Sequence, residues 1–200
     1  MLAPNPYFRP TMFFSGVKTF AALAATAHTV FAVPLVATRT AGCSRESLLA
    51  AADAYIAAQT AGKPDALSSR LAPNWEYEEN NVRIAVDKGV LSKAIQIDHI
   101  RTIADTIACA TFTEVVAANN PGAPYVIGTQ IRHDPASLNI TLIDSVATTT
   151  NSWLFNATRT LEYVLKEKPL WTPIPEAKRD SRDHIKAAGD AYMDMCTFRL

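Results

Sequence analysis

Three β-rich runs follow one another in the middle of the chain, separated only by short turns. Thr, Val, Ile and Phe dominate these runs, which cover residues 106–118, 125–133 and 138–149. Pro121-Gly122 marks the first turn and Asp134-Pro135 marks the second. Because strands joined by such short connections pair with their neighbours in opposite directions, the sequence predicts an antiparallel meander.

A helix is predicted ahead of the meander, over residues 46–58, where apolar side chains recur at helical spacing. Ser44 precedes this stretch as its N-cap, and Gly62-Lys63-Pro64 ends it. Residues 65–71 are expected to form a second, short helix that Pro73 closes. The chain therefore begins its fold with helices.

Two further predictions concern the segments on either side of the meander. Residues 75–84 alternate imperfectly around a polar Asn80-Asn81 turn and are interpreted as a bent strand or a hairpin. After the meander, residues 153–156 are expected to continue the last strand into a helix over 157–166.

The segment from Ser44 to Ile56 recurs near the end of the sequence, from Ser181 to Met193, at a constant offset. The identical pairs are Ser44/Ser181, Arg45/Arg182, Ala50/Ala187, Ala51/Ala188, Asp53/Asp190, Ala54/Ala191 and Tyr55/Tyr192. This offset is too long for a solenoid unit and matches the length of a small domain, which indicates tandem duplication.

The repeat sets the predicted domain organisation. An N-terminal extension and signal peptide cover 1–32, an α+β domain covers 33–170, and 171–200 hold a linker and the first helix of an incomplete second repeat. The apolar face of this last helix consists of Ile185, Ala188, Tyr192 and Cys196. We predict that this face docks on the first domain, because an uncovered apolar face of this size is unusual.

Composition narrows the class of partner. The 200 residues are 48% hydrophobic, which is enough to build one full core. Nineteen basic residues balance nineteen acidic ones, so no excess of positive charge favours nucleic acid or an anionic membrane surface. We therefore expect neither as a partner.

The first residues have the plan of a secretory signal peptide. A short start with one lysine, Lys18, leads into an uncharged and largely apolar run over 19–32, and cleavage is expected after Ala32. The alternative is a membrane anchor, but a run of about 14 residues is shorter than the roughly 20 that span a bilayer. We predict a secreted protein that no longer contacts the membrane after cleavage.

Two other features agree with the secretory route. Asn139 and Asn156 each begin an Asn-Xaa-Thr glycosylation motif without proline in the middle position. Of the three cysteines, Cys43 and Cys109 are predicted to form a disulfide in an oxidising compartment. Cys196 is left over, either for a partner that a complete second repeat would supply or as a buried thiol.

Helices followed by an antiparallel sheet make an α+β protein in which a helix packs into the concave side of a curved sheet. This order resembles the cone-shaped SnoaL-like fold, which is related to nuclear transport factor two. The resemblance implies a pocket between sheet and helices. It does not decide function, because both enzymes and plain binding modules have this fold.

A narrower resemblance lies in a set of sequence blocks between Cys43 and Met195. The blocks are 71–80, 97–101, 105–114, 124–130, 153–158 and 171–175. Together they resemble a fungal secreted domain of unknown function. Some relatives in that family act as hetero-Diels–Alderases in meroterpenoid biosynthesis, so the resemblance implies that cofactor-independent chemistry of this kind is possible here.

The densest polar cluster near the predicted sheet is formed by Asp98, His99 and Arg101. In a strand His99 and Arg101 share one side, where they could bind an oxygenated ring and polarise it. The alternative is a surface turn in which Asp98 caps a helix.

Glu114 is a separate candidate, because it lies in an otherwise apolar run on the same side as Phe112. It either lines a cavity as a general acid or base or faces solvent.

Trp75, Tyr77 and Tyr125 are candidates for contact with a flat apolar ligand, although aromatic residues near strands more often pack in the core. We expect no metal site, because the four histidines and three cysteines show no ligand spacing. We also expect no cofactor, since the sequence has no glycine-rich phosphate loop.

Two functions remain open from the sequence. The first is a secreted cofactor-independent cyclase or isomerase, hetero-Diels–Alderase-like, that acts on a hydrophobic small molecule through the cluster around His99. The second is a non-catalytic secreted binding or structural protein, whose pocket is filled by its own side chains. The absence of a compact catalytic motif such as Gly-Xaa-Ser-Xaa-Gly favours the second.

Overall fold

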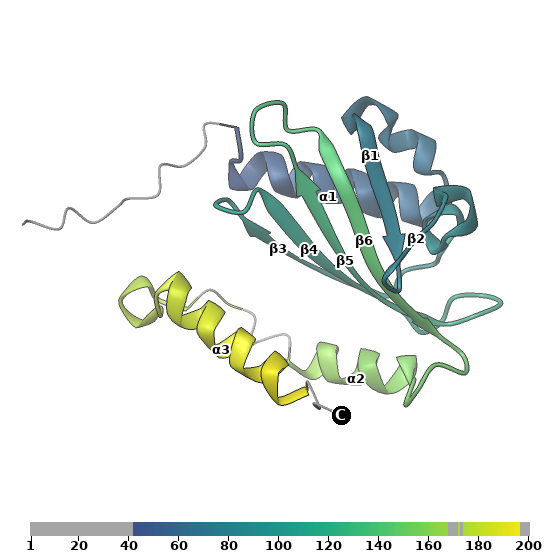
Figure 1. The fold of residues 1–200 in the computed structure, drawn as a ribbon. Helices are drawn as coiled ribbons and strands as arrows, with labels where there is room; N and C mark the ends of the chain where they lie inside the picture. The colour runs from purple at the N-terminus through teal and green to yellow at the C-terminus, as the bar shows by residue number, and fades with distance from the viewer. Residues whose placement is uncertain (1–41, 168–171, 173, 197–200) are drawn as a thin grey trace, which may run out of the picture. The chain divides into compact units, whose positions relative to one another are not determined.

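The computed structural model describes residues 42–167, 172 and 174–196 and shows an α+β protein (Figure 1). The predicted signal peptide and the boundary at residue 171 lie outside the described residues. The elements are α1 (Arg45–Ala61), η1 (Pro64–Arg70), β1 (Leu71–Glu79), β2 (Val82–Arg83), η2 (Val86–Lys88), η3 (Val90–Ser92), β3 (His99–Asp105), β4 (Ala110–Ala117), β5 (Tyr125–His133), β6 (Ile140–Thr149), α2 (Ala157–Glu167), η5 (Glu176–Lys178) and α3 (Arg182–Cys196), where η marks a 3-10 helix.

The six strands form one sheet in the order β2-β1-β6-β5-β4-β3. Strands β3 to β6 pair antiparallel with their neighbours in sequence, so the predicted meander is confirmed. The meander has one strand more than the three predicted runs, because β3 comes before them. Residues 106–109, which the prediction included in the first run, form the turn between β3 and β4. The sheet is mixed rather than purely antiparallel, since β1 lies parallel to β6.

Helix α1 begins and ends where the sequence predicts. The Ser44 hydroxyl accepts a hydrogen bond from the backbone N–H of Ser47 at 3.1 Å, which caps the first turn. Gly62 ends the helix in the left-handed conformation, with φ of 63°, a region that favours glycine. The predicted short helix after it is a 3-10 helix, η1.

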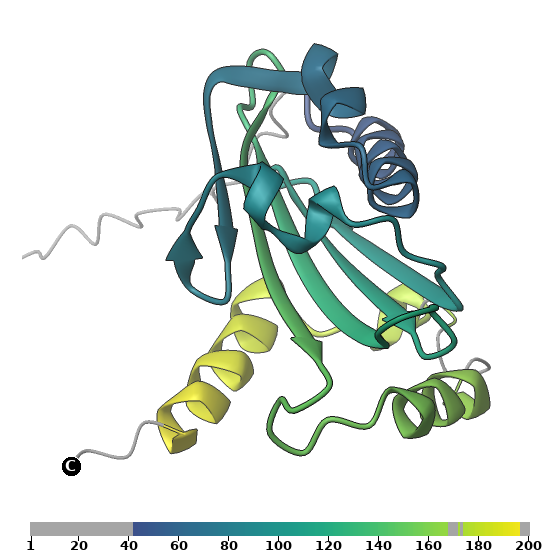
Figure 2. The same cartoon turned by 90° about the vertical axis from the view of Figure 1, so that its right-hand side faces the viewer.

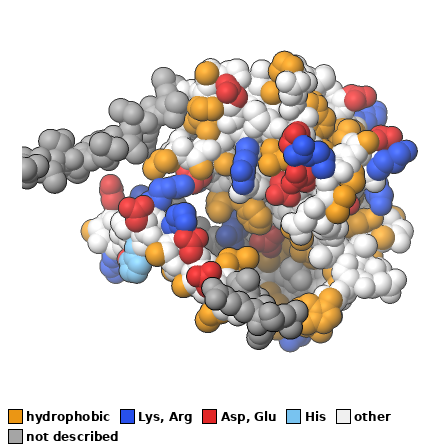
Figure 3. Space-filling model, viewed as in Figure 1, with side chains coloured by type: hydrophobic (Ala, Val, Ile, Leu, Met, Phe, Trp, Pro, Cys, Tyr) orange, Lys and Arg blue, Asp and Glu red, His pale blue; other side chains and the backbone are white. Residues whose placement is uncertain are grey.

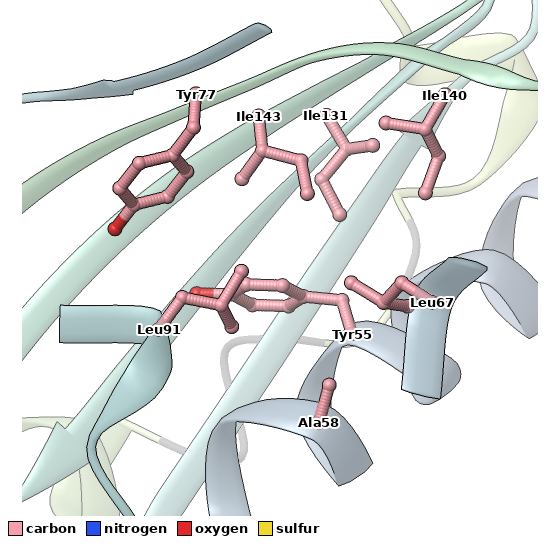
Figure 4. Packing of buried hydrophobic residues seen from close by; sticks show 8 residues of the cluster. All are labelled: Tyr55, Ala58, Leu67, Tyr77, Leu91, Ile131, Ile140 and Ile143. Atoms are coloured by element: carbon pink, nitrogen blue, oxygen red, sulfur yellow. The ribbon is translucent and has the colours of Figure 1, made fainter. Parts of the chain in front are cut away.

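The hydrophobic core lies between α1 and one face of the sheet, which we call the inner face (Figures 2 and 4). Tyr55 and Ala58 reach from α1 toward the isoleucines of β5 and β6, and Leu67 of η1 and Leu91 of η3 close the cluster (Figure 4). A second cluster around Val115 and Ile127 continues the core along the sheet. Burial of these side chains is the main favourable contribution to folding.

A disulfide joins Cys43, just before α1, to Cys109 in the turn between β3 and β4, as predicted. It packs with Leu48 in a small cluster of its own. The bond closes a loop of 66 residues, and restricting the unfolded chain in this way contributes roughly 4 kcal/mol. The helix is therefore fixed to the sheet at its first turn.

The hairpin expected around Asn80-Asn81 is present as β1 and β2. Both asparagines have positive φ, 53° and 64°, which suits a two-residue hairpin loop. The Asn80 side chain also pairs with the backbone of Ala147, accepting a hydrogen bond at 2.9 Å and donating one at 3.1 Å. This contact holds the hairpin against β6.

The segment after β6 differs from the prediction. Residues 153 and 154 form a turn instead of extending the strand, and Leu154 has a positive φ of 50°. Asn156 then caps α2, because its Oδ1 accepts a hydrogen bond from the Arg159 N–H at 2.9 Å. Helix α2 itself is confirmed, and it contacts β4 and β5.

The repeated segment near the C-terminus is helical, but the docking predicted for it is wrong. In α3 the side chains of Ile185 and Tyr192 are 62% and 63% exposed, and Ala188 is exposed as well. In the first copy the equivalent tyrosine, Tyr55, is fully buried. The physical reason is that α1 already covers the inner face, so this face has no room for a second helix of the same kind.

None of the helices within the described part of the chain is long and apolar enough to cross a membrane. One side of the molecule, shown in Figure 3, carries hydrophobic side chains in small groups between acidic and basic ones. Neither sign of charge dominates this side.

Candidate functional site

The space between α1 and the sheet, where the SnoaL-like resemblance implies a pocket, is occupied by side chains. The Tyr55 hydroxyl lies 2.7 Å from Thr129 Oγ1, which lies 2.9 Å from Ser145 Oγ, and all three residues are buried. Burial raises the pKa of Tyr55 to about 12, so the hydroxyl keeps its proton at neutral pH. This chain of hydroxyls connects the helix to β5 and β6.

A second buried contact fills the neighbouring part of the inner face. The Tyr77 hydroxyl donates a hydrogen bond to Glu79 Oε2 at 2.8 Å, and the same oxygen accepts one from the backbone N–H of Val90 at 2.6 Å. Burial raises the pKa of Tyr77, and the hydrogen bond to Glu79 raises it further. Gly89 packs so closely here that a Cβ on it would lie 2.3 Å from the Tyr77 ring.

The predicted aromatic ligand contacts belong to this inner side. Tyr77 and Tyr125 are buried in the two core clusters, and Trp75 is half-buried against the first of them. All three therefore contribute to packing.

The opposite face of the sheet, which we call the outer face, carries the predicted polar residues. Strand alternation places His99 and Arg101 on the same side of β3, as expected, and Arg101 is directly opposite Glu114 on β4. Glu114 is half-buried. The structure thus brings these three residues to one face and separates them from Trp75, Tyr77 and Tyr125.

Asp98 has a different environment from His99 and Arg101. It precedes β3, and its carboxylate accepts hydrogen bonds from the backbone N–H of Asn119 at 2.8 Å and from the Asn119 side chain at 2.9 Å. Burial raises the pKa of Asp98, but these hydrogen bonds outweigh it and hold the pKa below its usual range. Asp98 thus fixes the turn that follows β4, and it caps no helix.

The outer face also has a hollow that the sequence did not reveal. It has a volume of about 230 Å³ and lies over β3, β4 and β5. We call it the β3–β5 hollow; its lining residues are Ile103, Ala104, Asp105, Ala108, Ala110, Thr111, Phe112 and Gln130.

Two large apolar side chains form the floor of the β3–β5 hollow. Ile103 and Phe112 are opposite each other on β3 and β4, and they are 51% and 42% exposed. Gly128 on β5 leaves room for the Phe112 ring, since a Cβ there would lie 3.0 Å from it. The sequence offered one signal for this face: Phe112 and Glu114 are two residues apart on a strand, so their side chains lie on the same side of the sheet.

Polar groups surround these apolar side chains. Asp105 Oδ1 accepts hydrogen bonds from the N–H groups of Ile107 and Ala108, and Asp105 Oδ2 pairs with Arg182 at the start of α3. Burial raises the pKa of Asp105, but these contacts together lower it below its usual range. Arg132 Nε donates a hydrogen bond to Gln130 Oε1 at 2.7 Å.

Among the described residues, no group of three or more His, Cys, Asp or Glu side chains is placed to hold a metal ion. The arrangement on the outer face can supply an apolar surface, a guanidinium and a carboxylate. It can therefore bind a small molecule, and Arg101 with Glu114 could polarise or deprotonate it.

No protein-family model and no curated protein sequence matches this chain. Among solved structures, PrhC from Penicillium brasilianum is similar over 63% of this chain and 91% of its own, with 12% identity and a TM-score of 0.38. A putative ketosteroid isomerase from Kribbella flavida is similar over 68% and 96%, with 14% identity and a TM-score of 0.39. An LEH-like epoxide hydrolase of M. tuberculosis is similar over 64% and 98%, with 15% identity and a TM-score of 0.37. Likenesses this distant assign no activity to this chain.

Proposed function

We propose that this protein binds a small, mainly apolar molecule in the β3–β5 hollow and does not transform it. The observation that carries the proposal is the exposed pair of Ile103 and Phe112 on the floor of the hollow. Large apolar side chains exposed side by side in a concave site are typical of ligand contacts.

The polar groups of the hollow favour binding over catalysis. Both oxygens of Asp105, the carboxylate that lines the hollow, are already engaged by backbone N–H groups and by Arg182. A general base needs a free lone pair within reach of the proton that it removes. Three of the roughly four lone-pair positions of Asp105 are occupied and its pKa is held below the usual range, so it is a weak base that mainly holds the turn and the start of α3.

A second candidate function rests on Arg101 and Glu114. They form the next cross-strand pair along the outer face from Ile103 and Phe112, so a ligand on the apolar pair would reach them. A guanidinium and a carboxylate beside an apolar surface would suit a cofactor-independent cyclase or isomerase, hetero-Diels–Alderase-like, for which orientation supplies much of the rate.

We propose that the protein is secreted. The disulfide between Cys43 and Cys109 agrees with an oxidising compartment. Asn156 is exposed, and its Oδ1 caps α2, so the nitrogen that would carry a glycan remains accessible. Asn139 is half-buried, and we propose it as the less accessible of the two glycosylation sites.

Chemical-shift mapping of isotope-labelled protein with small aromatic compounds tests the binding function. We expect the shifts to cluster on Ile103, Phe112 and their neighbours. Phe112→Ala should weaken binding by about tenfold, because it removes part of the apolar contact, equivalent to about 1.4 kcal/mol. Val146→Ala, an exposed residue of β6 outside the hollow, is the matched control and should bind normally.

Chemical-shift changes confined to residues outside the hollow, or the same affinity in Phe112→Ala as in the unmodified protein, would show the binding function to be wrong.

Incubation with quinone-methide and alkene substrates tests the second candidate function. Turnover that disappears in both Arg101→Gln and Glu114→Gln would establish catalysis in its place.

A further inference from the structure

We infer that the molecule bound in the β3–β5 hollow carries a hydrogen-bond-accepting oxygen, and that a carboxylate suits the site best. This inference rests on the proposed binding function. It follows from which polar atoms around the hollow are engaged within the protein and which remain for a ligand.

Contacts within the protein occupy most of the acceptor positions of Asp105 and one of the two on the Gln130 side-chain oxygen. Asp105 accepts from Ile107 N–H at 3.0 Å, from Ala108 N–H at 2.9 Å and from Arg182 at 2.5 Å. Gln130 Oε1 accepts from Arg132 Nε at 2.7 Å. Of roughly four acceptor positions on the carboxylate and two on the amide oxygen, one of each therefore remains for a ligand that offers only donors.

The donors, in contrast, remain available. Because Gln130 Oε1 is held by Arg132, the amide NH₂ is directed away from that contact, and it donates to no atom of the described residues. Arg182 uses Nη1 on Asp105, and its guanidinium has further N–H groups that no described residue accepts. These groups can donate to a carbonyl or a carboxylate.

Charge favours the carboxylate. Two guanidinium groups, of Arg132 and Arg182, contact the lining residues Gln130 and Asp105, which supply one negative charge. Asp144, opposite Gln130 on β6 and on the same face, balances the second guanidinium, so a carboxylate gains from charge-assisted hydrogen bonds to Arg182 and not from a net charge of the rim; this gain is larger at low salt.

The size of the hollow limits the apolar part of the ligand. A volume of about 230 Å³ is below the roughly 300–1,000 Å³ of sites for drug-sized molecules. One aromatic ring on Ile103 and Phe112, with a short arm to the rim, is the class of compound that these dimensions favour. Phenylacetate is a simple member of that class.

Three probes of similar size and different head groups test the inference: phenylacetate, phenylethanol and phenylethylamine. Their dissociation constants are measured by chemical-shift titration of the full chain at low and high salt. We expect phenylacetate to bind about fivefold more tightly than phenylethanol, the size expected for charge-assisted contacts exposed to solvent. Phenylethylamine should bind most weakly.

Arg182→Gln and Gln130→Leu should each remove most of the advantage of the acid and leave phenylethanol binding nearly unchanged. Lys186→Gln is the matched control, because Lys186 is also on α3 but pairs with Asp190 and contacts no lining residue. High salt should reduce the advantage of the acid in the unmodified protein.

The outcomes separate this inference from the proposed function. Equal binding of all three probes in the hollow, or tighter binding of the amine, would overturn the inference and leave the binding function standing. Failure of all three probes to bind in the hollow would overturn both.

Discussion

The hydroxyl of Tyr55 lies 2.7 Å from Oγ1 of Thr129, and this single buried contact joins α1 to the middle of the sheet. Thr129 continues to Ser145 on β6, so three buried hydroxyls form a chain through the core. In low-dielectric surroundings such a chain is favourable only while every member is satisfied.

Tyr55→Phe should therefore destabilise the protein by about 1 kcal/mol, because it removes one hydrogen bond while the bond between Thr129 and Ser145 remains. Urea denaturation measures the change. Tyr192→Phe, at the equivalent position of the exposed helix α3, should change stability by less than about 0.5 kcal/mol. Equal effects of the two substitutions would contradict the role of the hydroxyl chain.

His133 should make the fold less stable in mild acid. Burial lowers its pKa in the folded protein below 6.5, although the hydrogen bond to the Leu138 carbonyl opposes this, and Arg70 is the nearby charge that lowers it further. The unfolded chain therefore takes up the proton first as the pH falls. Stability is complete above about pH 6.5 and is lost as the pH falls from there toward the folded pKa.

The free energy of unfolding at several pH values between neutral and mildly acidic conditions tests this. His133→Gln should lose less stability over that interval than the unmodified protein does. His184→Gln is the control, because His184 is exposed and its ring pairs with Asp180. An unchanged pH dependence in His133→Gln would assign the effect to other groups.

Reduction of the disulfide should weaken the fold. Without the bond between Cys43 and Cys109, roughly 4 kcal/mol of stability should be lost, since the unfolded chain regains the freedom of a loop of 66 residues. Urea midpoints with and without reductant give the value. The double variant Cys43→Ala/Cys109→Ala should be as unstable without reductant as the parent is with it, and should not respond to reductant.

Two glycines should respond in opposite ways to a methyl group. At Gly62 the backbone has φ of 63°, and a Cβ would lie 2.4 Å from Ala94 N, so Gly62→Ala should cost more than about 1 kcal/mol. At Gly189, inside α3, a Cβ would meet no atom within 4 Å, so Gly189→Ala should be neutral or increase helix stability by up to about 1 kcal/mol. Thermal unfolding of both variants decides whether close packing governs the first position.

The predictions that held depend on local rules. Ser44, Gly62 and the Asn80-Asn81 turn each act through their own backbone and its nearest neighbours, so one sequence is enough to recognise them. The turn between β3 and β4 was missed because it contains neither glycine nor proline. Its positive-φ residue is Cys109, with φ of 51°, which no pattern of turn residues would indicate.

The site was harder to foresee than the fold. Alternation along one strand correctly placed Arg101 beside His99 and Glu114 beside Phe112. Alternation could not show which face of the sheet α1 covers. Because α1 covers the inner face, Tyr77 and Tyr125 pack in the core, whereas Ile103 and Phe112 on the outer face are exposed. The exposure of Tyr192 has the same origin, since the tyrosine shared by the two related helices is buried in α1 and exposed in α3.

The parallel pairing of β1 with β6 also sets the order of events when the chain folds. Strands β3 to β6 can form from neighbours in sequence, whereas Leu71 has to wait for Ile140, on the last strand of the sheet. Closing so long a loop costs entropy before any contact repays it, which slows folding. During synthesis the hairpin of β1 and β2 therefore leaves the ribosome early and remains without its partner strand until β6 has followed.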